Sequence, residues 1–555
     1  MANDNEKLSY TVKTENQLTD EAKDVVIINS PEELLSFLLD ILDFGDYVES
    51  EEILEHNNSY RILSALMKKF TVLTIAIEQK YVDKIYRDSY YMHFSCKHGK
   101  YRRFCKRLFL FEGNVFESSP DATFSDLDLR KLQERFIGTV VIRPLKEGKI
   151  GRTLINPYFI FEKNDTYLRY AKYSVTIFGM RLQINAFPFS MQDGETTTCA
   201  EITILNLMDY FSRKYPEYKC ILPSEIAEIA EKNGYERNLP TRGLGYSVIT
   251  KVFSEVGFSP RLYSMDLFTD MSQFKRMMHY YIESGLPVAI GVKVDEKTRH
   301  SIVCIGHGKI QYGNIGKKIY AVYDSIVDNY IWIVDSADLC NHYIIMDDSD
   351  CPYKTCEWKT YTKDIKPSNM SMLGNYEPDT LMVPLYKRMF LEAQNAYDIC
   401  TSALASSQVG IQRVCPDLGV KERPVIIRLF MCSSRNYKQR RIINFTFENR
   451  EARERYINLL LPRFIWVCEI YNKESYCEGK AIGEIVIDAT ASPYDGVKSV
   501  LLLHYPHYIL ACQRNLNKLF DKDEDFEVLK NWEPFSGYDH NLFLPEKIKE
   551  NEYKH

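Results

Sequence analysis

One cysteine of the chain stands where a helix is expected to begin. Residues 187–211 read FPFSMQDGETTTCAEITILNLMDYF, and apolar residues recur at helical spacing from Ile204 onward. Thr198 and Glu201 fit a capping box, which places Cys199 at the first helical position. The positive end of the helix dipole favours a thiolate there, and backbone N–H groups at the same end can stabilise an oxyanion. Cys199 is therefore a candidate nucleophile, and the alternative is a small buried thiol that only packs.

A thiolate nucleophile needs a histidine as general base, and the chain contains eleven histidines. His300 opens the apolar run HSIVCIGHG, which follows the strand-like GLPVAIGVKV after a short polar turn. A histidine at the mouth of such a strand can project over the start of the cysteine helix. His300 is thus the first candidate for the base, and His307, at the far end of the same run, is the weaker one. A purely structural histidine is the alternative.

The base needs an acid that fixes its tautomer, and the next apolar strand ends in two of them. HYIIMDD finishes in Asp347 and Asp348, and the strand register decides which carboxylate meets the imidazole. Asp347 is favoured because it directly follows the apolar run. Gln192, seven residues before Cys199, carries a side-chain N–H that can serve an oxyanion hole.

The elements that must position these residues fall into a helical half followed by an antiparallel half. Helices are expected over residues 222–234, 246–257 and 271–285, and strands over residues 286–294, 299–308, 318–325 and 342–348. The order is a cysteine-headed helix, further helices, and then a sheet that carries the histidine and the acid.

This order resembles the papain-like cysteine peptidases, and it is closest to the bacterial branch that includes the leader peptidases of peptide exporters. In that branch a segment similar to TRGLGYSVITKVFSEVGFSP also stands between the nucleophile helix and the histidine strand. The resemblance covers residues 186–365, about a third of the chain. It implies a papain-like fold in which Cys199, His300 and an aspartate hydrolyse an amide bond.

The sequence departs from the family pattern in two places. The family usually has its oxyanion glutamine six residues before the cysteine, where this chain has Asp193, and a one-residue bulge would bring Gln192 into that role. The segment between the histidine and the acid is also long, and it is expected to form an additional hairpin over the cleft.

Two further domains are expected around the peptidase-like segment. Residues 1–185 mix helical patterns, including residues 59–81, with strand-like ones and are predicted to form an N-terminal α/β domain. Residues 366–555 again mix strands with a helix and are predicted to form a C-terminal α/β domain. The whole chain is therefore expected to be α+β, with a central papain-like cysteine peptidase domain between two α/β-type domains.

Composition limits the partners. A formal net charge of -6 gives no general attraction to nucleic acid or membranes, and the basic stretch CKHGKYRRFCKR at residues 96–107 is expected to be a solvated strand face. The N-terminus is polar and the apolar runs are interrupted, which predicts a cytoplasmic protein with no membrane span. The 14 cysteines are then expected to be mostly reduced.

The sequence supports a metal site or a cofactor less well than it supports a thiol peptidase. Two groups of cysteine and histidine residues are candidate zinc sites. The first consists of Cys340, His342, Cys351 and Cys356, and the second of His93, Cys96, His98 and Cys105. The first group lacks the tight Cys-x-x-Cys spacing of a zinc knuckle, and alternation along an aromatic-rich strand explains the second more simply. Walker, Rossmann and His-Glu-x-x-His motifs are missing from the sequence, so no cofactor is expected.

The sequence therefore predicts a thiol peptidase that acts on a peptide or protein, with flanking domains that select the substrate or a regulatory partner protein. The main alternative is a catalytically inactive papain-like scaffold that binds a partner, because a fold does not fix an activity. A related acyl transferase or deamidase is a further alternative. By analogy alone, a bacterial enzyme of this kind would fit stress or anti-phage defence.

Overall fold

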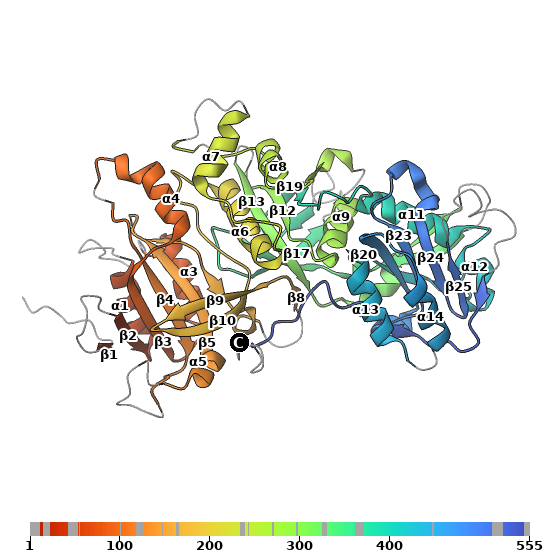
Figure 1. The fold of residues 1–555 in the computed structure, drawn as a ribbon, viewed down its shortest axis with the longest axis horizontal. Helices are drawn as coiled ribbons and strands as arrows, with labels where there is room; N and C mark the ends of the chain where they lie inside the picture. The colour runs from red at the N-terminus through yellow and green to blue at the C-terminus, as the bar shows by residue number, and fades with distance from the viewer. Residues whose placement is uncertain are drawn as a thin grey trace, which may run out of the picture.

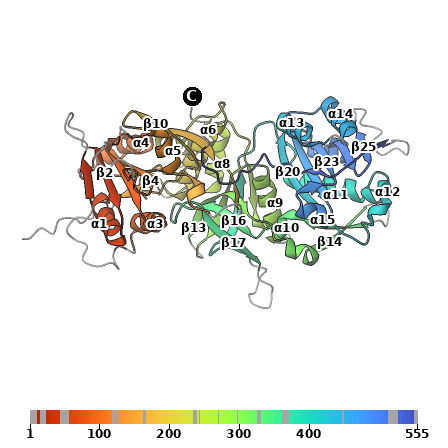
Figure 2. The ribbon, with the colours of Figure 1, turned by 90° about the horizontal axis from the view of Figure 1, so that it is seen from below.

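The computed structural model describes most of the chain (Figure 1). The described residues are 11–14, 23–42, 54, 56–99, 101–117, 124, 127–146, 148–161, 166–233, 239–241, 243–268, 271–295, 298–324, 330–360, 371–446, 449–512 and 526–548. Helices and strands both occur throughout, as the α+β prediction requires. Three larger sheets follow one another along the long axis of the molecule (Figures 1 and 2).

The first sheet is antiparallel and lies at one end of the molecule. Its strands are β1 (Thr11–Thr14), β2 (Lys23–Ile28), β3 (Leu73–Tyr81), β4 (Cys105–Glu112), β5 (Phe136–Arg143), β6 (Lys149–Ile150) and β7 (Leu154–Ile155). Its helices are α1 (Pro31–Ile41), α3 (Asn58–Met67), α4 (Lys84–Met92) and α5 (Leu129–Arg135), and a hairpin of β9 (Ala171–Ile177) and β10 (Met180–Ala186) follows.

Two local predictions in this part are wrong. The helix expected over residues 59–81 ends with α3, and residues 73–81 form β3, because Thr74, Ile75 and Ile77 are β-branched and suit a buried strand. The basic stretch at residues 96–107 is mostly irregular, and β4 begins only at Cys105.

The second sheet carries the histidine and the acids. It runs in the order β11 (Arg261–Ser264), β19 (Glu377–Val383), β12 (Val288–Lys293), β13 (Arg299–Gly308), β16 (His342–Met346), β17 (Lys354–Thr360) and β18 (Ser371–Leu373), and β8 (Thr166–Leu168) also pairs with β13. Its helices are α6 (Cys199–Lys214), α7 (Pro223–Lys232), α8 (Tyr246–Glu255) and α9 (Met271–Glu283). The helices and strands expected at these places are confirmed.

Helix α6 is buried on more than the one face that its apolar spacing predicts. Every residue from Ala200 to Phe211 is buried, because α6 contacts both β13 of the second sheet and β9 of the hairpin. Ile204, Leu205 and Met208 join the same core as Val303 of β13. This packing fixes the start of α6 relative to the histidine strand.

The third sheet lies at the other end of the molecule. It runs in the order β14 (Ile319–Tyr323), β15 (Tyr330–Asp335), β20 (Val425–Ser433), β21 (Phe464–Tyr471), β23 (Gly483–Asp488), β24 (Val500–Tyr505), β25 (Tyr508–Ala511) and β26 (Glu527–Val528). Its helices are α10 (Ser336–Leu339), α11 (Ala393–Ala405), α12 (Ile411–Val414), α13 (Ser434–Asn444), α14 (Arg450–Asn458) and α15 (Lys473–Cys477). β22 (Lys480–Ala481) pairs with β27 (Phe535–Ser536).

Sheet membership does not follow the predicted segment of residues 186–365. β14 and β15 form the additional hairpin expected between the histidine and the acid, but β15 pairs with β20, so the hairpin extends the third sheet instead of covering a cleft. Conversely, β19 lies beyond residue 365 and pairs with β11 and β12. The division into three domains stays a prediction.

A C-terminal strap, residues 541–547, ties the parts together. It leaves the third sheet and pairs with β8, where Phe543 and Leu168 exchange two backbone hydrogen bonds of 3.0 Å. Asn541 donates to the backbone of both Glu283 and Met431 at 2.9 Å. In the described part of the chain, no helix has the length and apolar character that crossing a membrane requires.

Candidate functional site

Cys199 is the first residue of α6, as the capping pattern predicts. The Glu201 carboxylate accepts the backbone N–H of Thr198 at 3.0 Å and the hydroxyl of Thr241 at 2.7 Å. Glu201 is buried, so these bonds hold the helix start firmly, while Cys199 itself is half-buried and keeps some access to solvent. The sulfur is therefore both positioned and reachable.

The loop before Cys199 is organised by Asp193. Its carboxylate accepts the backbone N–H groups of Glu195, Thr196 and Thr197 at 2.7–3.0 Å, and it accepts the Thr196 hydroxyl at 2.6 Å. Burial raises the pKa of Asp193, but the Arg143 guanidinium and these hydrogen bonds outweigh that effect and lower it below its usual value. Asp193 thus turns into the loop and shapes it.

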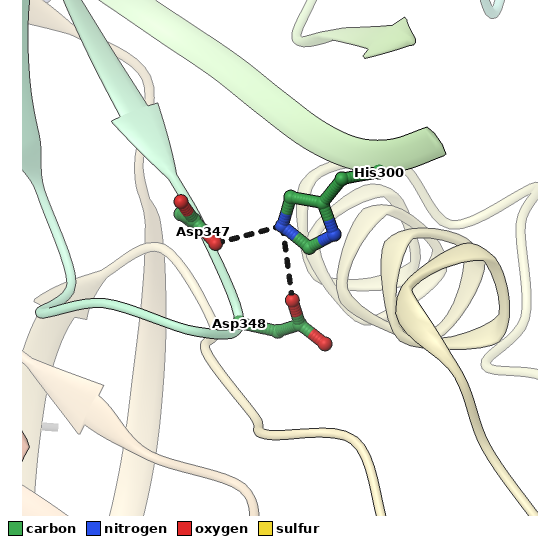
Figure 3. Close-up of side chains that lie close together, drawn as sticks. All are labelled: His300, Asp347 and Asp348. Carbon is green, nitrogen blue, oxygen red and sulfur yellow. Dashed lines mark hydrogen bonds and ion pairs between the residues drawn. The ribbon is translucent and has the colours of Figure 1, made fainter. Parts of the chain in front are cut away.

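His300 and the two predicted acids meet at the mouth of the second sheet (Figure 3). His300 lies in β13, and its Nε2 is 2.9 Å from Oδ1 of Asp347 and 3.4 Å from Oδ1 of Asp348. β13 pairs with β16, which ends one residue before Asp347, so the sheet register brings the imidazole and the carboxylates together. The side chain of His300 is 10% exposed.

Asp347 is the better held of the two acids. The backbone N–H and the hydroxyl of Ser349 donate to its Oδ1 at 3.0 and 2.7 Å, and the Tyr376 hydroxyl donates to its Oδ2 at 2.5 Å. The Tyr376 ring also lies 6.1 Å from the imidazole of His300. The sequence analysis missed Tyr376 because this residue stands beyond residue 365, in the turn before β19. Its position next to a strand of the same sheet is the one feature that could have indicated its contact with Asp347.

Asp348 has a different environment. From the described residues, neither of its carboxylate oxygens receives a hydrogen bond of ordinary geometry, and its nearest polar neighbours include Nε2 of His300 and the backbone N–H of Gln192. Burial and the charge of Asp347 raise the pKa of Asp348 to about 7, although His300 opposes this rise. Asp348 therefore titrates near neutral pH.

The thiol of Cys199 interacts with the imidazole of His300. Burial lowers the pKa of His300, but hydrogen bonding to Asp347 and to Cys199 outweighs burial and raises it to about 10. The same imidazole helps to hold the pKa of Asp347 far below its usual range, against the effect of burial. Nε2 faces the carboxylates, so Nδ1 is the ring nitrogen that remains for another partner (Figure 3).

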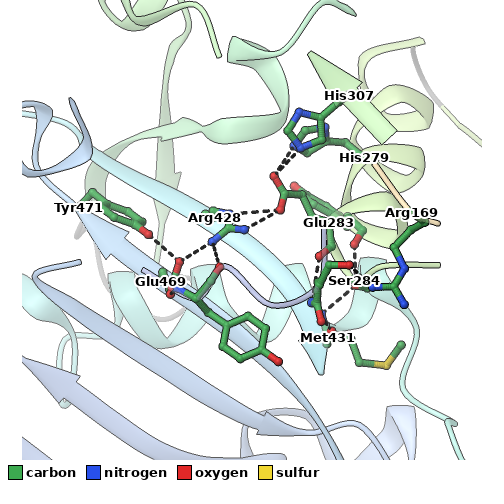
Figure 4. A network of polar contacts seen from close by, with 12 residues as sticks. Arg169, His279, Glu283, Ser284, His307, Arg428, Met431, Glu469 and Tyr471 are labelled. Carbon is green, nitrogen blue, oxygen red and sulfur yellow. Dashed lines mark hydrogen bonds and ion pairs between the residues drawn. The ribbon is translucent and has the colours of Figure 1, made fainter. Parts of the chain in front are cut away.

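Gln192 and His307, the two other residues predicted for the site, do not join Cys199, His300 and Asp347 through their side chains. Gln192 reaches Asp348 through its backbone N–H, and no contact of its side chain is established. His307 lies at the other end of β13, where its Nε2 is 3.1 Å from Oε1 of Glu283 (Figure 4). His307 therefore belongs to a buried network that joins α9 to the third sheet, and it does not meet Cys199.

That buried network contains a second cysteine and imidazole pair. Cys340 is 0% exposed and sits beside His279 and His307, whose charge and hydrogen bonding outweigh burial and lower the pKa of its thiol. A fully buried sulfur cannot meet a peptide, which distinguishes Cys340 from the half-buried Cys199.

The N-terminal part of the chain braces both loops of the site. His93 Nε2 and Lys97 Nζ contact the carboxylate of Glu195, in the loop before the cysteine. Arg61 of α3 donates to the backbone of Ser349 at 2.6 Å, next to the acids. The first sheet and its helices are thus part of the scaffold of the site.

Within the described residues, one group of three possible metal ligands lies close together: the donor atoms of His300, Asp347 and Asp348 are within 4.8 Å of one another. The two cysteine and histidine groups weighed from the sequence do not come together at that distance. The same two carboxylates also face the proton on Nε2 of His300.

No model of a known protein family matches the chain, and no curated protein matches it either.

Proposed function

We propose that this protein is a thiol hydrolase that cleaves a peptide or protein amide bond with Cys199 as nucleophile. The observation that carries the proposal is His300, whose Nε2 lies 2.9 Å from Asp347 and whose pKa is raised by hydrogen bonding to Asp347 and to Cys199. A thiol, an imidazole and an oriented carboxylate in this order are the parts of a nucleophilic triad. The resemblance to papain-like peptidases adds to this.

The raised pKa of His300 defines the resting state of the proposed site. With a pKa of about 10, the imidazole is protonated at neutral pH, and an imidazolium next to a sulfur favours the thiolate. Asp347 stabilises the imidazolium through Nε2 and fixes the ring orientation. The thiolate attacks the amide carbonyl, and His300 then gives its proton to the leaving amine.

The acyl-enzyme is released by the second half of the reaction. His300, now neutral, takes a proton from a water molecule as its oxygen attacks the thioester carbonyl. The C–S bond then breaks, which releases the acid product and returns Cys199 as a thiolate beside protonated His300. The first backbone N–H groups of α6 stand next to Cys199 and can bind the oxyanion of both tetrahedral intermediates. The side chain of Gln192 is proposed as an additional donor.

Labelling of the full chain with an iodoacetamide probe tests the proposal. We expect Cys199 to react faster than the exposed Cys96, Cys220 and Cys477, as mapped by mass spectrometry, because its thiolate is stabilised. Cys199→Ala abolishes that fast site, and His300→Ala slows it by at least tenfold. Cys220→Ala is the matched control and leaves the rate at Cys199 unchanged.

Two results would contradict the proposal. If His300→Ala leaves the rate at Cys199 unchanged, the imidazole does not activate the sulfur, and the inactive scaffold becomes the better reading. If a chelator abolishes labelling at Cys199, the His300, Asp347 and Asp348 group holds a metal instead of a shared proton. Analysis of the products distinguishes a peptidase from a transferase or a deamidase, because peptide cleavage liberates a new amino terminus.

A further inference from the structure

A cavity lies away from Cys199, where the second and third sheets meet. Its volume is about 680 Å³, within the range of sites for small ligands. Its walls include the last turn of α6, the segment after β19, the first turn of α13 and the strap. It therefore lies at the opposite end of α6 from the proposed nucleophile.

The cavity is strongly basic in a chain whose net charge is -6. Its lining includes six cationic side chains, which are Arg169, Lys214, Lys387, Arg388, Arg435 and Arg463. Among the described residues that line the cavity, Glu217 is the only one with a carboxylate, and it pairs with Arg463 at 3.5 Å. Such a concentration of positive charge, with one acid to offset it, indicates an anionic occupant.

Arg169 is the strongest indication of an anion, because its charge is buried and has no counter-ion among the described residues. The residue is 5% exposed, and its guanidinium donates to the hydroxyl of Tyr210 at 2.8 Å and to the backbone carbonyl of Asn541. Both acceptors are neutral, and no carboxylate of the described residues pairs with Arg169. A buried charge with neutral partners is costly, so an anion in the cavity that Arg169 lines would lower that cost.

The neighbours of Arg169 respond to the same positive field. Burial and the charge of Arg169 lower the pKa of Lys214 to about 8. Burial, together with Arg440, Lys214 and Arg169, also lowers the pKa of His540, which lines the cavity. The positive end of α13, an 11-residue helix that begins at Ser434, adds a further favourable dipole.

Aromatic rings form part of the same wall. Tyr386 packs against Phe464 with ring centroids 5.5 Å apart and an interplanar angle of 10°, and Tyr215 lies edge-on to Tyr386 at 5.5 Å. Both tyrosines and Phe464 line the cavity. Stacked rings next to clustered guanidinium groups suit a ligand that has a planar aromatic group and phosphates.

We propose that this cavity binds a phosphorylated small molecule of the nucleotide class, with its phosphates on Arg169, Lys214 and the cationic rim and its base against Tyr386 and Phe464. The proposal is independent of the thiol chemistry. It also gives the two sheets a shared ligand, because Lys214 belongs to α6 whereas Arg435 and Arg463 belong to the part of the chain that forms the third sheet.

Calorimetric titration of the full chain with ATP, inorganic pyrophosphate and adenosine tests it. We expect ATP to bind most tightly, pyrophosphate more weakly, and adenosine without a detectable signal, and we expect affinity for ATP to fall as salt rises. Arg388→Glu and Arg435→Glu change exposed rim residues and are each expected to weaken ATP binding at least tenfold. Lys214→Gln tests the interior in the same way.

Arg423→Glu is the matched control, because Arg423 is an exposed cation that does not line the cavity. It should leave ATP binding unchanged. The proposal is overturned if neither ATP nor pyrophosphate binds, if Arg388→Glu and Arg435→Glu bind ATP like the unchanged chain, or if a single-stranded oligonucleotide binds at this cavity and ATP does not.

Discussion

Asp347 and Asp348 are neighbours in sequence, yet their carboxylates do different work. Asp347 accepts hydrogen bonds from Ser349 and Tyr376 and stays ionised beside His300. Asp348 is buried with few partners and holds a proton up to a pH of about 7. The proposed site therefore contains one acid that orients the base and one whose charge depends on pH.

The burial of Asp348 should cost stability above neutral pH. Its pKa is raised from 3.8 to about 7, so the folded chain holds a proton that the unfolded chain has lost, and stability falls as pH rises from about 4 to 7. Asp348→Asn removes this cost and should stabilise the chain by about 2–4 kcal/mol at pH 8. Denaturant unfolding of both chains at pH 5 and pH 8 measures this difference in the free energy of unfolding. An equal stabilisation by Asp348→Asn at both pH values would contradict the raised pKa of Asp348.

Tyr376 acts through Asp347 and is proposed as a positioning residue. Tyr376→Phe removes the hydrogen bond to Oδ2 of Asp347, and hydrogen bonds to charged groups are typically worth about 1.5–3 kcal/mol. We expect roughly tenfold lower kcat on a cleaved peptide with little change in KM. Tyr494→Phe, at a residue that is 99% exposed, is the control. A change in KM alone would point to substrate binding instead.

The pH profile reports the charge of His300. Because the imidazolium must give a proton to the leaving amine, kcat/KM should decline as pH rises through about 10. Alkylation of Cys199 by iodoacetamide should not decline there, since the thiolate remains. An alkaline decline near pH 6.5, the ordinary value for histidine, would show that Asp347 and Cys199 do not hold the charge in place.

The loop from Asp193 to Thr198 determines how α6 presents its first residue. Asp193→Asn keeps one oxygen but replaces the acceptor of the Thr196 hydroxyl, beside Arg143, with an amide. We expect a loss of about 1–3 kcal/mol in stability at neutral pH and slower labelling of Cys199. The loss should shrink as pH falls below 3.8, because the lowered pKa of Asp193 stabilises the fold only while the carboxylate is ionised.

The control for this change is Asp417→Asn, at an exposed acid far along the chain. It should alter neither the unfolding midpoint nor the labelling rate. If Asp193→Asn slows labelling without any loss of stability, the carboxylate acts on the sulfur electrostatically and not by shaping the loop.

Periodicity and capping predicted the strands and helices around Cys199 and His300, because those signals are local. They could not predict that β14 and β15 join the third sheet, since the partner strand β20 lies about ninety residues further along the chain. Tyr376 was missed for the same reason: its contact with Asp347 depends on the strand order of the sheet. The residue types at 199, 300 and 347 were sufficient to suggest chemistry, whereas their contacts required the fold.

Arg428 of β20 joins the third sheet to α9, a helix of the second sheet, by an ion pair (Figure 4). It contacts Glu283 of α9 at 2.7 Å and Glu469 of β21 at 2.9 Å, and both carboxylates are buried. Arg428→Met takes one cationic partner from each buried carboxylate, although Glu283 keeps His307 at 3.1 Å and Glu469 keeps Arg441. Removing one member of a buried ion pair typically costs about 3–5 kcal/mol.

We therefore expect Arg428→Met to lower the stability of the chain and to split its thermal unfolding into separate calorimetric transitions. Adding Glu283→Gln should restore part of the loss, because a buried carboxylate that has lost Arg428 is then removed. Arg455→Met, at an exposed pair with Glu527, serves as the control and should change little. A single unshifted transition for Arg428→Met would show that this ion pair does not hold the sheets together.

The strap joins residues that are made at very different times during synthesis. The amide of Asn156 donates to the backbone of Glu546, 390 positions later, and Tyr170 donates to Leu544, 374 positions later. At ribosomal rates of about 5–20 residues per second, the surface that the strap covers waits roughly 20–80 seconds for its partner. The nascent chain thus carries an open edge at β8 during that interval, when a chaperone could shield it.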